Sequence, residues 1–179
     1  MKALRILRLG PFDAELAALA ARHMGDEFGV PWEVAPETAD PGFAFHPERQ
    51  QYHSSEVLAW LEKRARDEWR CLALTGVDLY IPILTFVFGE ARLGPGAAVV
   101  STHRLRQEFY GLPADDNILC QRLLRECAHE LGHTLGLRHC DNYECAMAGS
   151  PGVEWIDLKT AHLCTPCRAR AGLLESAVR

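Results

Sequence analysis

The segment from residue 129 to residue 139, HELGHTLGLRH, restricts the fold more than any other part of this chain. His129 and His133 are four residues apart, so on a helix they project from one face, one turn apart. Gly136 stands where such a helix has to end, because glycine adopts the left-handed conformation that closes helices without steric penalty. The chain can then reverse and bring His139 back beside the other two histidines. The segment therefore predicts a helix, a glycine turn and a returning loop.

Three imidazoles placed in this way match the ligand set of a catalytic zinc ion. Three protein ligands leave the fourth zinc position open for water, whereas structural sites are closed. Glu130 lies beside His129 on the same turn, where it can act on that water rather than bind the metal. The alternative is an exposed helix with a glycine cap and an unrelated third histidine; Gly136 and His139 together argue against it. We therefore expect zinc on His129, His133 and His139, with Glu130 as the catalytic general base.

The composition suits one globular domain. The chain has 179 residues, 48% of them apolar and 24% charged, without an internal repeat or a linker. We expect a single domain over residues 1–179, with an N-terminal subdomain at 1–136 and a C-terminal subdomain at 137–179. The net charge of −5 argues against a nucleic-acid partner. No apolar run approaches a membrane span, and the arginine-interrupted N-terminus does not resemble a signal peptide. We therefore expect a cytoplasmic protein without a membrane partner.

Four of the seven cysteines form two local pairs. Cys140 directly follows the third histidine and precedes Cys145 by five residues, and Cys164 and Cys167 form a C-x-x-C pair. Thiolates grouped in this way are the usual composition of a closed structural zinc site. A redox pair at Cys164 and Cys167, and His162 as a competing ligand, are the alternatives. The other cysteines are expected to be small core residues: Cys71, Cys120 and Cys127.

Two further residues are expected to support the catalytic site. Met147 can place its thioether beneath the histidines as an apolar floor, although methionine is also common core filler. Cys140 adjoins His139, so a zinc ion on the cysteines would restrain the loop that carries the third histidine. The sequence therefore predicts that the two metal sites are coupled.

Apolar spacing and turn residues predict strands that alternate with helices, which favours a largely parallel sheet with crossover helices. Pro31 suggests that the second strand is at an edge or contains a bulge, and residues 36–53 are expected to be a long loop. The stripe Leu124, Ala128, Leu131 and Leu135 is expected to face the core. Strands are expected at 3–9, 28–35, 71–75, 85–94 and 97–102. A helix capped by Asp13 is expected to run through His23, and the metal helix from about Asp115 or Asp116 to Leu135. A further helix is expected to start at Ser54 or Ser55, with Val57, Trp60, Leu61 and Ala65 towards the core.

The run from His129 to His139, followed by Cys140, Cys145, Met147, Cys164 and Cys167, resembles the archaemetzincins, a branch of the metzincin zinc-dependent metallopeptidases. The segment FVFGEA at 86–91 is also similar to their rim-strand sequence. The resemblance covers about half of the chain, from the rim strand to the C-terminus. Sixteen residues separate Met147 from Cys164, about one fewer than is typical of that family. This departure affects the shape of a loop and leaves the ligand set intact.

The resemblance implies a metzincin-like α/β (α+β) fold: a twisted mixed sheet with an antiparallel rim strand, an active-site helix and a small C-terminal zinc-bound subdomain. It implies two Zn²⁺ ions, a catalytic one on the three histidines and a structural one on Cys140, Cys145, Cys164 and Cys167. It also implies that Met147 belongs to a methionine-containing turn. The rim strand, from Phe86 to Leu93, would bind an extended peptide as an additional strand.

Two functions fit these expectations. The first is a zinc metallopeptidase that hydrolyses peptide bonds, in an aminopeptidase-like manner if it acts on free N-termini. The second is a proteolytically weak or inactive zinc-stabilised protein that binds an extended peptide. Glu130 favours the peptidase, because a binding protein needs no base beside the metal. No tyrosine follows Met147 as a second oxyanion donor, and the sequence does not orient Tyr143. A zinc-ribbon nucleic-acid module is disfavoured by the acidic charge and the histidines.

Overall fold

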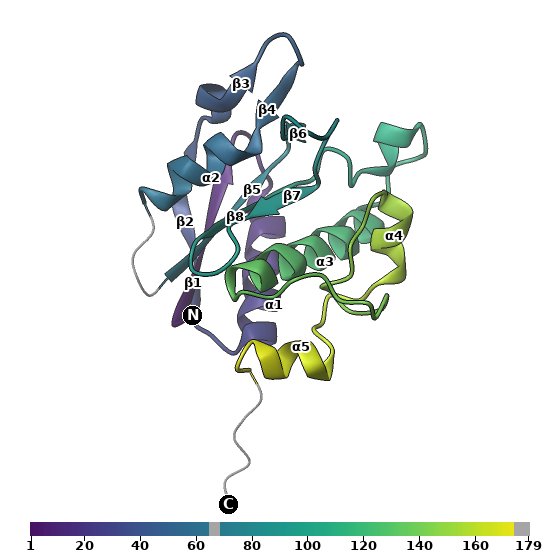
Figure 1. Cartoon of the computed structure of the whole chain (residues 1–179). Helices are drawn as coiled ribbons and strands as arrows, with labels where there is room; N and C mark the ends of the chain where they lie inside the picture. Colours follow the sequence, from purple (N-terminus) through teal and green to yellow (C-terminus); the bar gives the residue numbers. More distant parts are fainter. Residues whose placement is uncertain (65–68, 174–179) are drawn as a thin grey trace, which may run out of the picture.

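The computed structural model describes residues 1–64 and 69–173. Its framework is a five-stranded sheet with the strand order β2-β1-β5-β8-β7 (Figure 1). Four strands are parallel and the edge strand β7 is antiparallel to β8. This confirms the mixed sheet with one antiparallel rim strand. The strands are β1 (Ala3–Leu9), β2 (Trp32–Ala39), β5 (Trp69–Thr75), β7 (Gly89–Ala91) and β8 (Ala97–Ser101).

Helices cover both faces of this sheet (Figure 1). Helices α1 (Ala14–Phe28) and α3 (Asp116–Thr134) pack on one face, and α2 (Ser54–Glu62) packs on the other. Successive β5 residues alternate between the two resulting cores: Leu72 belongs to the first, Cys71 and Ala73 to the second. Burial on both faces explains why the central strands are continuous apolar runs in the sequence.

Helix α1 begins as predicted but ends later than predicted. The Asp13 carboxylate caps it by accepting a 2.7 Å hydrogen bond from the Leu16 N–H. The prediction placed residue 28 at the start of a strand, but Met24 and Phe28 are buried and extend the apolar face of the helix. The helix closes only at Gly29, which has a left-handed φ of 64°.

Strand β2 lies at the edge of the sheet, as Pro31 suggested, but it begins at Trp32 and not at Phe28. Pro36 lies inside it, at the point where the register with β1 shifts between Ile6 and Arg8. An edge strand tolerates a residue without an N–H at such an irregularity.

Residues 36–53, expected to be a loop, contain the end of β2 and three short elements. These are the 3-10 helix η1 (Pro41–Ala44), β3 (Phe45–His46) and β4 (Gln51–His53). With β6 (Leu79–Tyr80) they form a small sheet in the order β3-β4-β6. Strands of two or three residues are too short to show an alternating pattern.

Helix α2 begins at Ser54 as expected. Val57 and Leu61 are buried and Trp60 is partly buried, as the spacing predicts. Ala65, also expected on this face, lies outside the described residues.

The predicted rim strand at 85–94 is regular only over Gly89–Ala91. Val87 instead bridges to Leu79, whose carbonyl accepts its N–H at 2.9 Å, so the chain changes partner before β7 begins. Phe88 is already hydrogen-bonded to β8, because its carbonyl accepts the Ser101 N–H at 2.8 Å.

Helix α3 begins after Asp115, whose carboxylate accepts the Ile118 N–H at 3.0 Å, and it ends at Thr134. Of the predicted core stripe, Ala128 and Leu131 are fully buried, whereas Leu124 and Leu135 are only partly buried. A second buried row on the helix is Leu119, Leu123, Cys127 and Leu131. Among the other predicted core cysteines, Cys71 is buried but Cys120 is only half-buried.

The remaining elements are η2 (Gln107–Tyr110), which precedes α3, and the short helices α4 (Val153–Leu158) and α5 (Thr165–Arg170), which follow it. Over residues 1–64 and 69–173, no helix combines the length and the apolar character of a membrane span.

Candidate active-site cleft and metal centres

A tight turn after α3 returns the chain toward the helix. The N–H groups of Leu135 and Leu137 both donate to the carbonyl of Gly132, at 3.0 and 3.1 Å. Gly136 has a left-handed φ of 83°, as predicted for the closing glycine. The turn brings His139 beside the two helical histidines.

The three imidazoles converge. The ring centroids of His129, His133 and His139 lie 4.6–5.3 Å apart, and each ring offers a nitrogen within 4.8 Å of the others. His129 is buried, His133 is half-buried and His139 is exposed, so the group opens toward solvent on one side.

Backbone carbonyls determine which nitrogens face the centre. His129 Nδ1 lies 2.8 Å from the Ala146 carbonyl, and His133 Nδ1 lies 2.8 Å from the Leu137 carbonyl. A carbonyl only accepts, so in both rings Nδ1 carries the proton and Nε2 carries a lone pair. The two Nε2 atoms are 3.1 Å apart. Two lone pairs at this distance repel unless a cation lies between them.

This spacing fits a metal ion. Two imidazoles on a tetrahedral zinc place their nitrogens about 3.3 Å apart. Metal-bound histidines commonly donate their other N–H to a carbonyl, which fixes the ring. Burial lowers the pKa of His129 well below its usual value and also lowers that of His133. Both rings are therefore held in the neutral form that binds metals.

Glu130 is nearly fully buried, with 5% exposure, and lies at the cleft next to the histidines. Burial raises its pKa well above the usual range, the negative charges of Glu126 and Glu90 raise it further, and Lys159 opposes the shift. Strand β7 passes directly over this carboxylate. A Cβ on Gly89 would lie 2.7 Å from Glu130 Cγ and 2.7 Å from the Val99 carbonyl oxygen.

The histidines and Glu130 lie in a cleft of about 460 Å³. One wall consists of Ile81 and residues 84–91, which includes β7. The α3 side contributes Glu126, His129, Glu130 and His133, and the returning chain contributes His139, Ser150 and Pro151.

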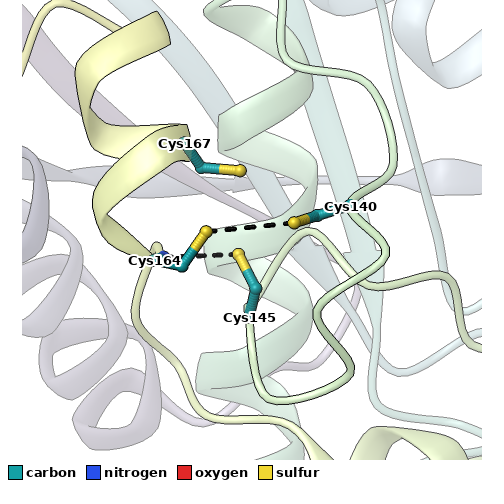
Figure 2. A group of neighbouring side chains, drawn as sticks. All are labelled: Cys140, Cys145, Cys164 and Cys167. Carbon is teal, nitrogen blue, oxygen red and sulfur yellow. Dashed lines mark hydrogen bonds between the residues drawn. The ribbon is translucent and has the colours of Figure 1, made fainter.

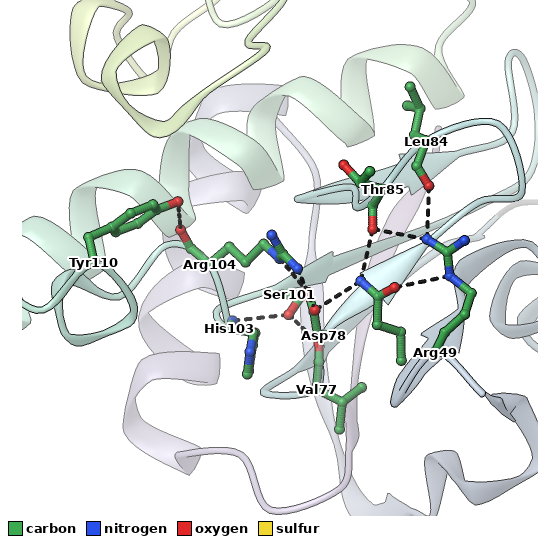
Figure 3. Close-up of polar contacts among 10 residues, drawn as sticks. Arg49, Val77, Asp78, Leu84, Thr85, Ser101, His103, Arg104 and Tyr110 are labelled. Carbon is green, nitrogen blue, oxygen red and sulfur yellow. Dashed lines mark hydrogen bonds and ion pairs between the residues drawn. The ribbon is translucent and has the colours of Figure 1, made fainter. Parts of the chain in front are cut away.

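A polar network holds the wall in place (Figure 3). Asp78 accepts two 2.7 Å hydrogen bonds from Arg104 and one of 2.9 Å from Gln51. Gln51 and Arg49 both donate to the carbonyl of Thr85, at 2.9 and 3.2 Å. The network therefore connects the small sheet to the wall of the cleft.

Met147 packs against the active-site helix at Gly132, one residue before His133. It is fully buried, and a Cβ at position 132 would overlap its sulfur. Only glycine at position 132 allows this approach. The Met147 carbonyl also accepts the Cys140 N–H at 2.9 Å, which links the methionine to the cysteine loop.

A buried ion pair beside the cleft was not found by sequence reasoning. Lys159 is 1% exposed, and its Nζ lies 2.8 Å from Glu126 Oε1, which is one turn before Glu130. The contact is an ion pair by distance, although its angle is not that of a hydrogen bond. Nζ also donates to the Ala148 carbonyl at 3.2 Å. No spacing signal marks such a pair, because its partners are far apart in the chain.

The four predicted cysteines form a second cluster, between the returning loop and α5 (Figure 2). Cys140 Sγ and Cys164 Sγ are 3.9 Å apart, and the Cys164 N–H donates to Cys145 Sγ at 3.3 Å. Tetrahedral zinc places two sulfurs about 3.8 Å apart, whereas a disulfide requires about 2.05 Å. The thiols are free. The cluster therefore fits a closed metal site better than a redox pair.

Thiol acidity within this cluster is uneven. Burial raises the pKa of Cys145 and of Cys167. Burial also acts against ionisation of Cys164, but hydrogen bonds from the Cys167 N–H and the neighbouring sulfurs outweigh it and lower its pKa.

His162 does not join the cysteines. Its Nδ1 lies 2.8 Å from the Glu27 carboxylate, which also accepts the Leu163 N–H at 3.1 Å and a hydrogen bond of 2.7 Å from Arg168. Glu27 is on α1, so this contact fastens the cysteine-bearing chain to the first helix.

The fold and this cleft define a protein of the zinc-peptidase class, and comparison with known proteins agrees. The model of peptidase family M54 matches residues 45–171. Archaemetzincin of Methanocaldococcus jannaschii is 38% identical over 159 residues, which cover 89% of this chain and 87% of that protein. Archaemetzincin of Thermococcus kodakarensis is 41% identical over 129 residues, 71% of this chain and 69% of that protein. The chain therefore belongs to peptidase family M54, the archaemetzincins.

Solved structures show the same fold. The zinc-dependent peptidase of Methanocorpusculum labreanum matches with a TM-score of 0.83 and 30% identity, over 94% of this chain and 99% of that one. Archaemetzincin of Archaeoglobus fulgidus, complexed with malonate, matches with a TM-score of 0.80 and 30% identity, over 94% of this chain and 99% of that one.

Proposed function

We propose that this chain is a zinc-dependent metallopeptidase in which His129, His133 and His139 hold the catalytic zinc and Glu130 is the general base. One observation carries the proposal: two imidazole lone pairs face each other at 3.1 Å in a cleft that also holds a buried carboxylate. A cation resolves the repulsion between the lone pairs, and the exposed side of the third histidine leaves room for water and substrate.

When bound, zinc would acidify water and polarise the carbonyl of a peptide. Glu130 takes the proton of the attacking water and passes it to the leaving amine. Its burial supports this role, because burial raises the pKa of this carboxylate and so makes it a stronger proton acceptor than an exposed glutamate.

The substrate would be a peptide in extended conformation along β7. This strand is at the edge of the sheet and lines the cleft beside Glu130, so a peptide can be added to it by backbone hydrogen bonds. We further propose that Cys140, Cys145, Cys164 and Cys167 hold a structural zinc in a C-terminal subdomain. Its role is to fix the loop that presents His139. An aminopeptidase-like preference and a cytoplasmic location stay predictions.

A second function is favoured by one observation. The residues that line the described cleft include no tyrosine, and Tyr143 is 62% exposed outside it. A missing oxyanion donor fits a weak or inactive enzyme that binds peptides and does not cleave them. The buried base argues for the peptidase.

The test compares wild type with Glu130→Gln in a peptide-library digest read by mass spectrometry. Glu108→Gln, an exposed glutamate on η2, is the matched control. We expect Glu130→Gln to lose at least about 100-fold in activity, the lower range for a general base, with the zinc content of wild type. Equal hydrolysis by all three proteins would contradict the proposal. Zinc-loaded wild type that binds peptides without cleaving them would support the binding protein. Peptides with blocked and free N-termini test the aminopeptidase preference.

A further inference from the structure

A third group of metal-ligand side chains lies outside the two sites described above. His46 ends β3, His53 ends β4 and Glu56 is in the first turn of α2. His46 Nε2 lies 3.2 Å from Glu56 Oε1, and His53 Nδ1 lies 3.5 Å from the same oxygen. All three ligand atoms lie within 4.8 Å of one another.

The His53 ring lacks the hydrogen bonds that a buried imidazole needs. Its side chain is 18% exposed, yet both ring nitrogens are sealed from solvent and neither makes a hydrogen bond of regular geometry. A buried polar atom without a partner costs about 1–3 kcal/mol. A cation between His53 and Glu56 would give Nδ1 a partner.

We propose that His46, His53 and Glu56 bind a divalent transition-metal cation, for which Zn²⁺ is the natural probe. Imidazole and carboxylate are ligands of zinc and its neighbours in the first transition row. The contacts of 3.2 and 3.5 Å bracket the separation of about 3.3 Å between two ligand atoms on tetrahedral zinc. The exposed side of His46 and Glu56 leaves the remaining position to water.

The surroundings of the group suit a cation. The buried Tyr80 ring contacts both imidazoles, with centroids 5.6 Å from His46 and 5.2 Å from His53, so one side of the site is apolar. Arg49 also lies over Tyr80, at 4.1 Å from the ring centroid. Its guanidinium is held by the carbonyls of Leu84 and Thr85 and by Gln51. Its charge is therefore directed to these acceptors.

The position connects this site to the cleft. Ser55, between His53 and Glu56, donates to the carboxylate of Glu90 at 2.9 and 3.1 Å. Glu90 belongs to β7 and lines the cleft. A bound cation would therefore fix the start of α2 behind the rim strand.

The experiment is equilibrium dialysis of the full chain against Zn²⁺ at about pH 7.5, where free histidine is neutral, with bound zinc counted by mass spectrometry. Wild type is compared with His46→Gln and Glu56→Gln, two half-exposed side chains. His103→Gln and Glu108→Gln are the controls, since neither residue belongs to the group. We expect wild type and both controls to bind one more equivalent of zinc than either variant.

The measured quantity is the difference in bound zinc between wild type and each variant, so zinc at the other two sites cancels. Failure of the proposed peptidase function would therefore not affect this difference. Histidine-selective NMR provides a second measurement, in which added zinc should shift the ring signals of both His46 and His53 in wild type. An equal zinc count in wild type and both variants, or unshifted His53 signals at saturating zinc, would overturn the proposal.

Discussion

Gly89→Ala tests whether the rim strand positions the catalytic carboxylate. The new Cβ would lie 2.7 Å from Glu130 Cγ, 2.9 Å from Glu130 Oε1 and 2.7 Å from the Val99 carbonyl. The carbonyl belongs to the neighbouring strand β8 and cannot move far, so Glu130 has to be displaced. A displacement of about 1 Å in an active site costs on the order of 100-fold in rate.

The effect on stability is smaller. Replacing glycine by alanine inside a strand normally stabilises by about 0.5–1 kcal/mol, whereas overpacking costs about 1–3 kcal/mol. We therefore expect Gly89→Ala to lower the free energy of unfolding by about 1–2 kcal/mol and kcat/KM by about 100-fold, with unchanged zinc content.

Gly76→Ala is the matched control, because a Cβ there meets only ordinary contacts, at 3.8 Å from Pro11 O and 3.9 Å from Thr102 Oγ1. The assays are peptide hydrolysis, urea unfolding and zinc analysis. If Gly89→Ala hydrolyses peptides as fast as Gly76→Ala, Glu130 is not held by β7 and the reasoning is wrong.

Three further predictions concern the supports of the site. Burial alone would raise the pKa of Asp78, but hydrogen bonds from Arg104 and Gln51 outweigh it and lower the pKa. The ionised carboxylate therefore stabilises the fold at any pH above its pKa in the unfolded chain, about 3.9. This stabilisation is lost as the pH falls through the lower pKa of the folded state. Asp78→Asn should therefore cost about 2 kcal/mol near neutral pH, and urea unfolding should show this difference shrinking below about pH 4; a constant difference would contradict the ion pair. Lys159→Met leaves the Glu126 carboxylate buried without its partner and should cost about 3–5 kcal/mol in the same assay. The double variant Lys159→Met/Glu126→Leu should recover most of that loss, and additive losses would show that the two residues do not interact. Cys164→Ser should release zinc from the cysteines and also weaken zinc at the histidines, because Cys140 adjoins His139 and is hydrogen-bonded to Met147. Metal analysis that shows one zinc lost and the other retained at wild-type affinity would remove the coupling.

The sequence predicted which histidines and which cysteines come together, because their geometry is local. A spacing of four residues on a helix, a glycine turn and a C-x-x-C pair each determine positions within a few residues of one another. The same holds for the Asp13 cap, which is present.

Features that depend on distant contacts were predicted poorly or missed. The end of α1 depends on the burial of Met24 and Phe28 against other elements. The presence of apolar residues in the sequence does not by itself reveal this burial. The short β7 results from the bridge between Val87 and Leu79. The Lys159–Glu126 pair joins separate elements without a spacing signal.

Anomalous diffraction at the zinc edge, from crystals grown with excess zinc, tests the central claim most directly. We predict a peak between the Nε2 atoms of His129 and His133 that is also within bonding distance of His139, about 2.0–2.1 Å from each nitrogen. Well-ordered rings around a position without anomalous density would contradict the account.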